Sequence, residues 1–351
     1  GYNRQVFTEK TIPPINEWFF AGNSPGLGTP ERVGAVYFTM LNPITNTICG
    51  FIGTGNTGPG NLKQDFWYYD PAQESWDYML GNFPMPRTDA FGFGITTTDN
   101  LGRKVTNIYV GGGTDANGNV KEDFYKYSFN SGTWNRVYPD YPQKIKAGVA
   151  FVIDDKAYIG TGATDYNDRG NFFMFDSKKL ENFEYPWVST RGLGNDPDLY
   201  ARRNAVAFVI GNHAFVGTGM KITGSDTVFY NDLWMFTPHF EPGLSQWSMC
   251  APMPTSGRAK AVGFAVDNQG YVGLGMNSSG ELQDLYRYDP YNNKWYQIAD
   301  YKIGPDYTGQ IQKTSGAFGF GIHKRGYVGA GYNGDEQTQP FNGEFWIYRP
   351  W

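Results

Sequence analysis

Short stretches in which apolar or aromatic side chains alternate with more polar ones recur along the chain, for example at 66–69 and 285–288. Alternation over four to eight residues indicates a β-strand, because successive side chains of a strand point to opposite faces. Six such aromatic strands are expected, and an acidic or amide residue opens each one. The opening residues are Asp65, Asp123, Asn171, Asp232, Asp284 and Glu344.

A signature of an apolar residue followed by Gly-x-Gly precedes each aromatic strand by about ten residues. Its last glycine is Gly55, Gly113, Gly162, Gly219, Gly275 or Gly331. A strand rich in small and aromatic residues comes before each signature, as at 90–95 and 261–266, and a turn and a tryptophan follow most aromatic strands. Each repeat therefore contains four short strands and no expected helix, which is typical of a propeller blade.

The sixth repeat lacks its last strand. It reaches its third strand at 344–348, and the sequence stops at Trp351. Trp18 stands 58 residues before Trp76, which is also the spacing from Trp76 to Trp134. We therefore expect residues 14–22 to supply the outer strand of blade six and to close the propeller by pairing the two chain ends. The sequence predicts one domain over 1–351, with repeats that start near residues 32, 87, 144, 202, 258 and 313.

This combination of glycine signature, aromatic strand and following tryptophan resembles the kelch family, and the resemblance covers nearly the whole chain. It implies an all-β, six-bladed kelch-type β-propeller. The composition agrees, because inner strands that converge need small residues such as the 46 glycines, whereas the space between diverging outer strands suits the 10 Trp, 25 Tyr and 26 Phe.

Charge and hydropathy remove several function classes. Lys and Arg total 29 against 34 Asp and Glu, mixed along the chain for a formal charge of −5, so no basic stripe for nucleic acid is expected. No run of 18 apolar residues is present, so no membrane-spanning segment is expected. Cys49 and Cys250 lie far apart in the sequence, and we expect two small buried hydrophobes rather than a disulfide.

Two motifs match cofactor sites only in part. Residues 53–58 match the Gly-x-Gly-x-x-Gly dinucleotide fingerprint, but a strand follows where that motif needs a helix. Residues 165–170 resemble half of a calcium loop with Asp176 as a distal acid, but Arg169 occupies a ligand position, so we interpret the segment as an Asx-rich turn. No metal and no cofactor is predicted.

The three histidines have no metal-ligand spacing, and the two-His, two-Tyr copper set of the kelch enzyme galactose oxidase cannot be placed. Sialidases are also six-bladed, but their Ser-x-Asp-x-Gly-x-x-Trp box has no match, because the most similar segment, 128–134, lacks the Asp.

Cations recur just before the first strand of each repeat. The predicted ligand-binding cations are Arg32, Arg87, Lys144, Arg202, Arg258 and Lys313. The four arginines each stand three residues before an alanine, whereas blade three has Ile145 and blade six has Thr314 at that position. These side chains are expected around one mouth of the axial channel, and in kelch modules that face binds ligand. The alternative is that each arginine pairs with the acid that opens an aromatic strand and ties neighbouring blades together.

Longer loops expected on the same face carry further candidates for ligand contact. They are Asp165, Tyr166, Tyr230, Tyr307 and Tyr332. A tyrosine ring can stack on a sugar or a peptide, and a cationic mouth favours carboxylates.

Two functions remain open from the sequence. The first is a non-catalytic module that binds a glycan, such as an acidic sugar, or a protein, and resemblance to exported bacterial kelch proteins implies a periplasmic or cell-surface location. The second is an enzyme that processes sialic acid, of mutarotase, epimerase or neuraminidase-like type, since kelch-type sialate mutarotases need only an acid or base and arginines for the carboxylate. Its candidate acids are Asp89, Asp165 and Asp306, and no catalytic residue is distinguished.

Overall fold

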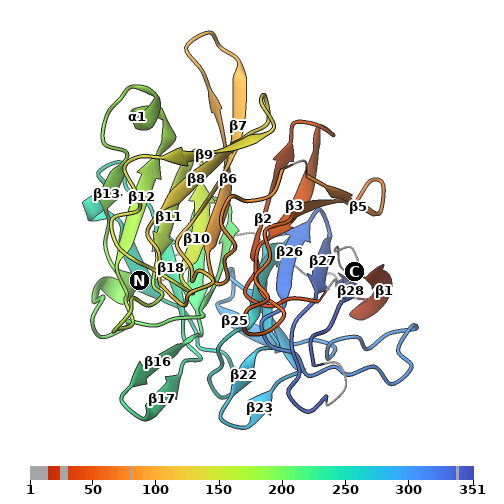
Figure 1. The fold of residues 1–351 in the computed structure, drawn as a ribbon. Coiled ribbons are helices and arrows are strands. Elements are labelled where there is room, and N and C mark those ends of the chain that lie inside the picture. Colours follow the sequence, from red (N-terminus) through yellow and green to blue (C-terminus); the bar gives the residue numbers. More distant parts are fainter. Residues whose placement is uncertain (1–14, 24–30, 80, 337–339) are drawn as a thin grey trace. The chain divides into compact units, whose positions relative to one another are not determined.

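The computed structural model describes residues 15–23, 31–79, 81–336 and 340–351. In this part of the chain, six four-stranded antiparallel sheets account for nearly all regular structure (Figure 1). They confirm the six predicted blades, which we number in chain order. By their internal contacts the residues divide into two compact units of three blades each. The prediction of a single domain over the whole chain stays a prediction.

The first unit consists of residues 34–203 and 237–246 and holds blades one to three. Blade one is β2 (Val36–Asn42), β3 (Thr47–Gly53), β4 (Phe66–Asp70) and β5 (Ser75–Tyr78); blade two is β6 (Phe91–Thr98), β7 (Lys104–Gly111), β8 (Phe124–Ser128) and β9 (Thr133–Val137); blade three is β10 (Val149–Ile153), β11 (Lys156–Gly160), β12 (Phe172–Asp176) and β13 (Trp187–Ser189). The strands of each blade pair in chain order, so every neighbouring pair is a hairpin.

The second unit holds blades four to six, from the described parts of 1–33, 204–236 and 247–351. Blade four is β14 (Val206–Ile210), β15 (His213–Gly217), β18 (Leu233–Thr237) and β19 (Gln246–Met249); blade five is β20 (Val262–Val266), β21 (Gln269–Gly273), β24 (Leu285–Asp289) and β25 (Lys294–Gln297); blade six is β26 (Phe318–Ile322), β27 (Arg325–Gly329), β28 (Glu344–Arg349) and β1 (Glu17–Asn23). Two small hairpins, β16 (Met220–Thr223) with β17 (Asp226–Phe229) and β22 (Met276–Asn277) with β23 (Gly280–Glu281), project from this unit at the lower end of Figure 1.

The N-terminal strand completes blade six as predicted. β1 pairs antiparallel with β28, with Trp18 opposite Tyr348 and Phe20 opposite Trp346. The predicted strand began at residue 14, which lies outside the described residues, and the strand observed begins at Glu17. The first and the last strands of the described residues therefore belong to one sheet.

The segment 299–312 covers the outer edge of β1. The Trp18 N–H donates to the Ile303 carbonyl at 2.9 Å, and the Phe20 N–H donates to the Asp306 carboxylate at 3.0 Å. Unpaired N–H groups on an edge strand invite pairing with other chains, and these two contacts remove that possibility locally. Segment 299–312 thus helps to hold the N-terminal strand in blade six.

Aromatic side chains fill the space between neighbouring blades of each unit. In the first unit, Phe124, Phe175 and Trp187 join blades two and three, with ring centroids 4.9 to 5.2 Å apart. Outer-strand tryptophans also bond to the preceding blade: Trp187 Nε1 donates to the Pro139 carbonyl at 3.4 Å, and Trp295 Nε1 donates to the Ala251 carbonyl at 2.8 Å. The aromatic excess is therefore mostly structural.

Inner strands approach one another closely where the sequence has small residues. A methyl group placed on Gly263 of β20 would lie 2.6 Å from Cβ of Val206 in β14, so a larger residue could not fit without moving one blade. The predicted role of glycine in the inner strands is confirmed at this position.

Within the described ranges, three short helical segments were not predicted. They are α1 (Ser177–Glu181), η2 (Leu193–Asn195) and η3 (Pro242–Leu244). Asp176 caps α1, because its carboxylate accepts the Lys178 N–H at 3.0 Å. The distal acid of the incomplete calcium-loop motif therefore has a structural role.

Candidate functional site

The candidate residues lie in two kinds of loop that recur in each blade. A lead-in loop is the segment just before the first strand of a blade, and a signature loop is the segment just after the glycine signature. The four arginines of the lead-in loops are buried: Arg32 and Arg258 are 1% exposed, and Arg87 and Arg202 are 0% exposed. An unpaired charge at such depth would cost several kcal/mol, so the surroundings of each guanidinium decide its role.

Arg87 pairs with the acid that opens the aromatic strand of blade two. Its guanidinium makes two hydrogen bonds with the Asp123 carboxylate, one of them 2.7 Å long, and a third with the Gly112 carbonyl at 3.0 Å. Its backbone carbonyl accepts the Gly55 N–H of blade one at 2.8 Å, so Arg87 connects two blades. Burial raises the pKa of Asp123, but the hydrogen bonds and charge of Arg87 outweigh it and hold that pKa below its ordinary value of 3.8.

Arg258 repeats the arrangement between blades four and five. It makes two hydrogen bonds of 2.9 Å with the Asp284 carboxylate and one of 3.1 Å with the Leu274 carbonyl, while its own carbonyl accepts the Gly219 N–H at 2.8 Å. For Arg87 and Arg258 the ion-pair interpretation is therefore confirmed. Ligand contact by these arginines stays a prediction, and it would require a guanidinium to leave its carboxylate.

Blade three replaces both partners together. Ile145 takes the arginine position and is 1% exposed, and the residue that opens the aromatic strand is Asn171 instead of an acid. The Ile145 carbonyl still accepts the Gly113 N–H at 2.7 Å, so the connection between backbones is kept. A cation without its anion would be costly here, and the exchange of both avoids that cost.

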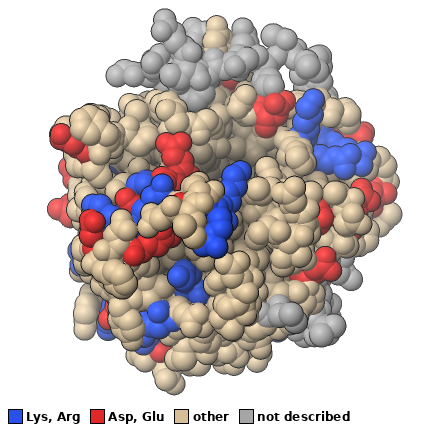
Figure 2. Space-filling model, turned by 90° about the horizontal axis from the view of Figure 1, so that it is seen from above, with Lys and Arg blue, Asp and Glu red and all other residues tan. Residues whose placement is uncertain are grey.

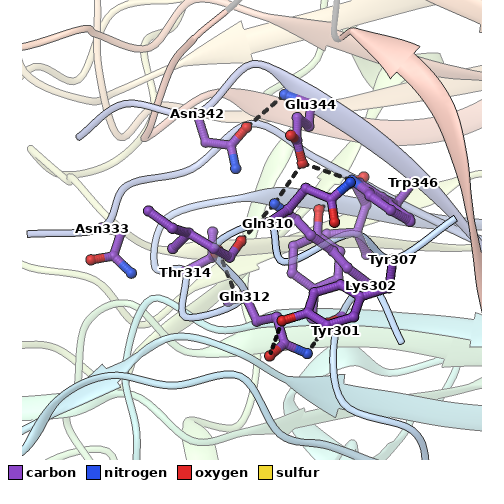
Figure 3. Close-up of polar contacts among 12 residues, drawn as sticks. Tyr301, Lys302, Tyr307, Gln310, Gln312, Thr314, Asn333, Asn342, Glu344 and Trp346 are labelled. Atoms are coloured by element: carbon purple, nitrogen blue, oxygen red, sulfur yellow. Dashed lines mark hydrogen bonds and ion pairs between the residues drawn. The ribbon is translucent and has the colours of Figure 1, made fainter. Parts of the chain in front are cut away.

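Blade six keeps the charge pair but builds it from other residues (Figure 3). Thr314 stands at the arginine position, and the cation is Lys302, whose ammonium lies 2.6 Å from the Glu344 carboxylate and 2.6 Å from the Ile311 carbonyl. Glu344 also accepts the Trp346 indole N–H at 2.9 Å. Burial lowers the pKa of Lys302, and the opposing effect of Glu344 does not fully restore it to its ordinary 10.5. Sequence reasoning missed Lys302, because it lies outside the repeat register.

The lysines of the lead-in loops differ from the arginines in exposure. The Lys144 side chain is 50% exposed and lies 3.4 Å from the Asp165 carboxylate, itself 36% exposed. Tyr166, the next residue in the signature loop of blade three, is 90% exposed. Lys313 is also exposed. The structure therefore brings Lys144, Asp165 and the backbone of Tyr166 together on the surface of the first unit.

The other predicted tyrosines occupy different environments. Tyr230 and Tyr332 are half-buried in the signature loops of blades four and six, and the Tyr332 ring packs on Phe341 with centroids 5.2 Å apart. Tyr307 lies in segment 299–312 beside Asp306, whose carboxylate accepts a backbone N–H of β1. Asp306 thus supports the outer strand of blade six, and its proposed acid role has no support from this position.

Sequence reasoning also missed a recurring backbone feature two residues after the arginine position. The residues at this left-handed position have φ between +53° and +67°: Gly34, Asp89, Ala147, Asn204, Lys260 and Gly316. In the first unit the Asp89 N–H donates to Gly34 and the Ala147 N–H donates to Asp89, both at 2.9 Å. Glycine, Asn and Asp tolerate such φ values best, so the residue types at four of the six positions were an available signal.

No large region of one charge is visible on the face drawn in Figure 2, where basic and acidic side chains are interspersed among neutral residues. Among the residues that the structure describes, no group of three His, Cys, Asp or Glu side chains is placed to hold a metal ion. Within the same ranges, none of the helices is long and apolar enough to cross a membrane.

Comparisons with known proteins agree on the fold. The solved structure of YjhT superposes with a TM-score of 0.67 at 15% identity and covers 92% of this chain and 95% of that one. The fold is thus a six-bladed kelch-type propeller. At this identity the likeness concerns the fold alone.

Sequence relatives are of two kinds. N-acetylneuraminate epimerase of Haemophilus influenzae (strain PittEE) is 34% identical over 108 residues, which is 29% of this chain and 26% of that protein. Kelch-like protein 15 of Mus musculus is 24% identical over 266 residues, which is 72% of this chain and 41% of that protein. The matches therefore span less than half the length of either relative.

The family model for the KLHDC2/KLHL20/DRC7 Kelch-repeats domain matches residues 105–310, more than half of the chain. These residues include the glycine signatures and aromatic strands of blades two to five, on which the sequence resemblance was based. The chain belongs to the kelch-repeat family.

Proposed function

We propose that this chain is a non-catalytic binding module that recognises an acidic glycan on the loops leading into its blades. The observation that carries the proposal is that some cations of these loops are buried and others are exposed. Arg87 and Arg258 are buried in ion pairs, whereas Lys144 and Lys313 are exposed in the equivalent loops of blades three and six. Exposed ammonium groups attract a carboxylate without breaking the internal pairs.

The loops also offer aromatic surface. Tyr166 is 90% exposed beside the Lys144–Asp165 pair, and an exposed ring can stack on the apolar face of a sugar. An exposed ion pair contributes only about 0–1 kcal/mol, so Lys144 can leave Asp165 for a polar oxygen of the ligand at little cost. This arrangement supports a carboxylate-bearing sugar over a neutral one.

One of the two kinds of relative supports the same ligand class. A protein that matches part of this chain is named N-acetylneuraminate epimerase, and N-acetylneuraminate is a sugar with a carboxylate. An exported location, in the periplasm or on the bacterial cell surface, is part of the proposal and rests on the resemblance to exported bacterial kelch proteins.

Thermal shift measurements test the proposal. N-acetylneuraminate and glucuronate should raise the melting temperature, and a neutral sugar such as N-acetylmannosamine should not, because a ligand that binds only the folded state stabilises it. A Lys144→Ala/Lys313→Ala double variant should lose the shift, while Lys178→Ala, which removes an exposed lysine of α1, should keep it. Absence of any shift with acidic sugars, together with binding of an acidic peptide, would replace the glycan with a protein ligand.

A second candidate function is an enzyme that processes sialic acid, and the partial match to N-acetylneuraminate epimerase is the observation that favours it. Asp89 is the candidate acid or base best placed in a lead-in loop, where its backbone carbonyl accepts the Ala147 N–H at 2.9 Å. NMR of free sialic acid distinguishes the two functions. An enzyme accelerates exchange between its anomers or forms its epimer, and Asp89→Asn abolishes the effect, whereas a binding module leaves both rates unchanged.

A further inference from the structure

Blade five has an unusual residue at the left-handed position. Lys260 has φ +53° and is exposed, whereas its neighbours at the equivalent positions of the same unit are Asn204 and Gly316. Lysine has no local hydrogen bond to favour a left-handed backbone, unlike Asn or Asp, and it lacks the freedom of glycine. A long charged side chain is therefore placed where the backbone alone would select a smaller residue, which is a reason to look for a function.

Backbone hydrogen bonds hold the left-handed conformation of Lys260. Its N–H donates to the Asn204 carbonyl at 3.2 Å, and its own carbonyl accepts the Gly316 N–H at 2.9 Å. On one side, Ala259 exchanges two backbone hydrogen bonds with Met276, at 2.9 and 2.8 Å. Two residues earlier, Arg258 is fixed by Asp284. The lysine is thus presented from a rigid support that is held on both sides.

The Lys260 ammonium makes no hydrogen bond or ion pair with the residues that the structure describes. Its neighbour Asn204, joined to it by the backbone hydrogen bond, contributes a carboxamide with two N–H donors. Its other neighbour, Gly316, contributes no side chain that could cover the ammonium. A cation and an amide are both groups that donate hydrogen bonds to the oxygens of a carboxylate.

We propose that Lys260 and Asn204 form the subsite that binds the carboxylate of an acidic sugar, with the ammonium supplying charge and the amide a hydrogen bond. The inference rests on the proposed function and names the residues that select the acidic class. On this assignment the left-handed Lys260 serves binding and lowers the stability of the free protein.

The test measures binding of N-acetylneuraminate and of its methyl ester, which lacks the charge, by isothermal titration calorimetry. Lys260→Gly should weaken binding of the acid about tenfold or more while raising the melting temperature, because glycine accepts the left-handed backbone. Lys260→Arg should keep most of the affinity. Asn204→Asp, which suits the backbone but places a negative charge beside the ligand, should weaken binding of the acid and leave binding of the ester nearly unchanged.

Each outcome decides the inference. Loss in Lys260→Gly and Asn204→Asp with retention in Lys260→Arg supports it. If the wild-type protein binds the acid and Lys260→Gly binds it equally well, the subsite lies elsewhere and the proposed function stands. If the wild-type protein binds neither N-acetylneuraminate nor glucuronate, the proposed function and this inference fail together. A melting temperature that falls in Lys260→Gly with affinity unchanged would make Lys260 a structural residue.

Discussion

The Lys302 ammonium of blade six lies 2.6 Å from the Glu344 carboxylate, and this pair takes the place that Arg258 and Asp284 hold in blade five. The acid comes from the same point of the repeat in both blades, the start of the third strand. The cation does not, because Lys302 belongs to segment 299–312, which also covers β1. The Lys302–Glu344 ion pair therefore connects the start of β28 to the segment that holds β1 in blade six.

Replacement of Lys302 should destabilise the fold. Lys302→Met leaves Glu344 beside buried rings without its cation, and we expect a loss of about 2–4 kcal/mol, less than for a fully buried acid because the Glu344 side chain is 30% exposed. Urea denaturation measures the change. Lys144→Met removes an exposed pair and should cost about 0–1 kcal/mol. Equal losses in the two variants would show that the Lys302–Glu344 pair adds nothing beyond surface electrostatics.

Arginine replacements separate the structural role from a ligand role. Arg87→Ala leaves the Asp123 carboxylate without its guanidinium, and we expect a loss of about 3–5 kcal/mol at pH 7. The matched control is Arg136→Ala, whose partner Asp140 forms a half-exposed pair at 2.7 Å and whose removal should cost about 1 kcal/mol or less. Because the pKa of Asp123 is lowered in the folded state, the contribution of this pair is present above pH 3.8 and is lost as pH falls through the folded pKa.

If Arg87→Ala unfolds at the same urea concentration as the wild type and abolishes sugar binding, the arginine acts on the ligand instead. The same comparison in blade five, with Arg258→Ala, shows whether both blades behave alike.

The architecture could be predicted because its determinants are local and repeated six times. The spacing between Trp18 and Trp76 placed the N-terminal strand in blade six, and the pairing of Trp18 with Tyr348 confirms it. A single-turn helix such as α1 has too little pattern to be detected, and its cap Asp176 was instead compared with a metal ligand. Features that depend on the repeat were visible, and features confined to one blade were not.

The candidate site could be predicted only in part, because sequence spacing gives the position of a side chain along a strand but not its depth. The same spacing marked Arg87, which is buried, and Lys144, which is half-exposed. Lys302 supplies a cation from outside the repeat, so no alignment of the blades could reveal it. Lys260 was detectable in principle, since Gly34 and Gly316 at the equivalent positions indicate a left-handed backbone.

The N-terminal strand should contribute strongly to stability through Trp18. This side chain is 0% exposed, contacts Tyr301 and Tyr348 at centroid distances of 5.0 and 5.1 Å, and donates its indole N–H to Ala299 at 3.3 Å. Trp18→Ala should cost about 3–5 kcal/mol. Phe20→Ala, on the same strand but 47% exposed, should cost far less. Thermal unfolding measures both, and equal effects would mean that β1 is held by its backbone alone.

Alkaline pH should destabilise the protein through its buried tyrosines. Burial, aided by the charges of Asp154 and Asp155, raises the pKa of Tyr158 to about 12 from its ordinary 10.0. In the unfolded chain this hydroxyl loses its proton at lower pH than in the folded protein, so stability is constant below pH 10 and falls between pH 10 and 12. Two units of pKa correspond to about 2.7 kcal/mol at pH 12 and above.

Absorbance at 295 nm and circular dichroism, followed together as pH rises, test this expectation. Part of the rise in absorbance at 295 nm should be slow and should follow the loss of β-structure seen by circular dichroism. The reason is that the buried hydroxyls ionise only when the protein unfolds. Tyr158→Phe removes one ionisable group and should make the fall in stability between pH 10 and 12 smaller by about 1–3 kcal/mol, while changing stability at pH 7 by about 1 kcal/mol or less. Complete ionisation at pH 11 in a protein that keeps its circular dichroism would show that these tyrosines are open to solvent.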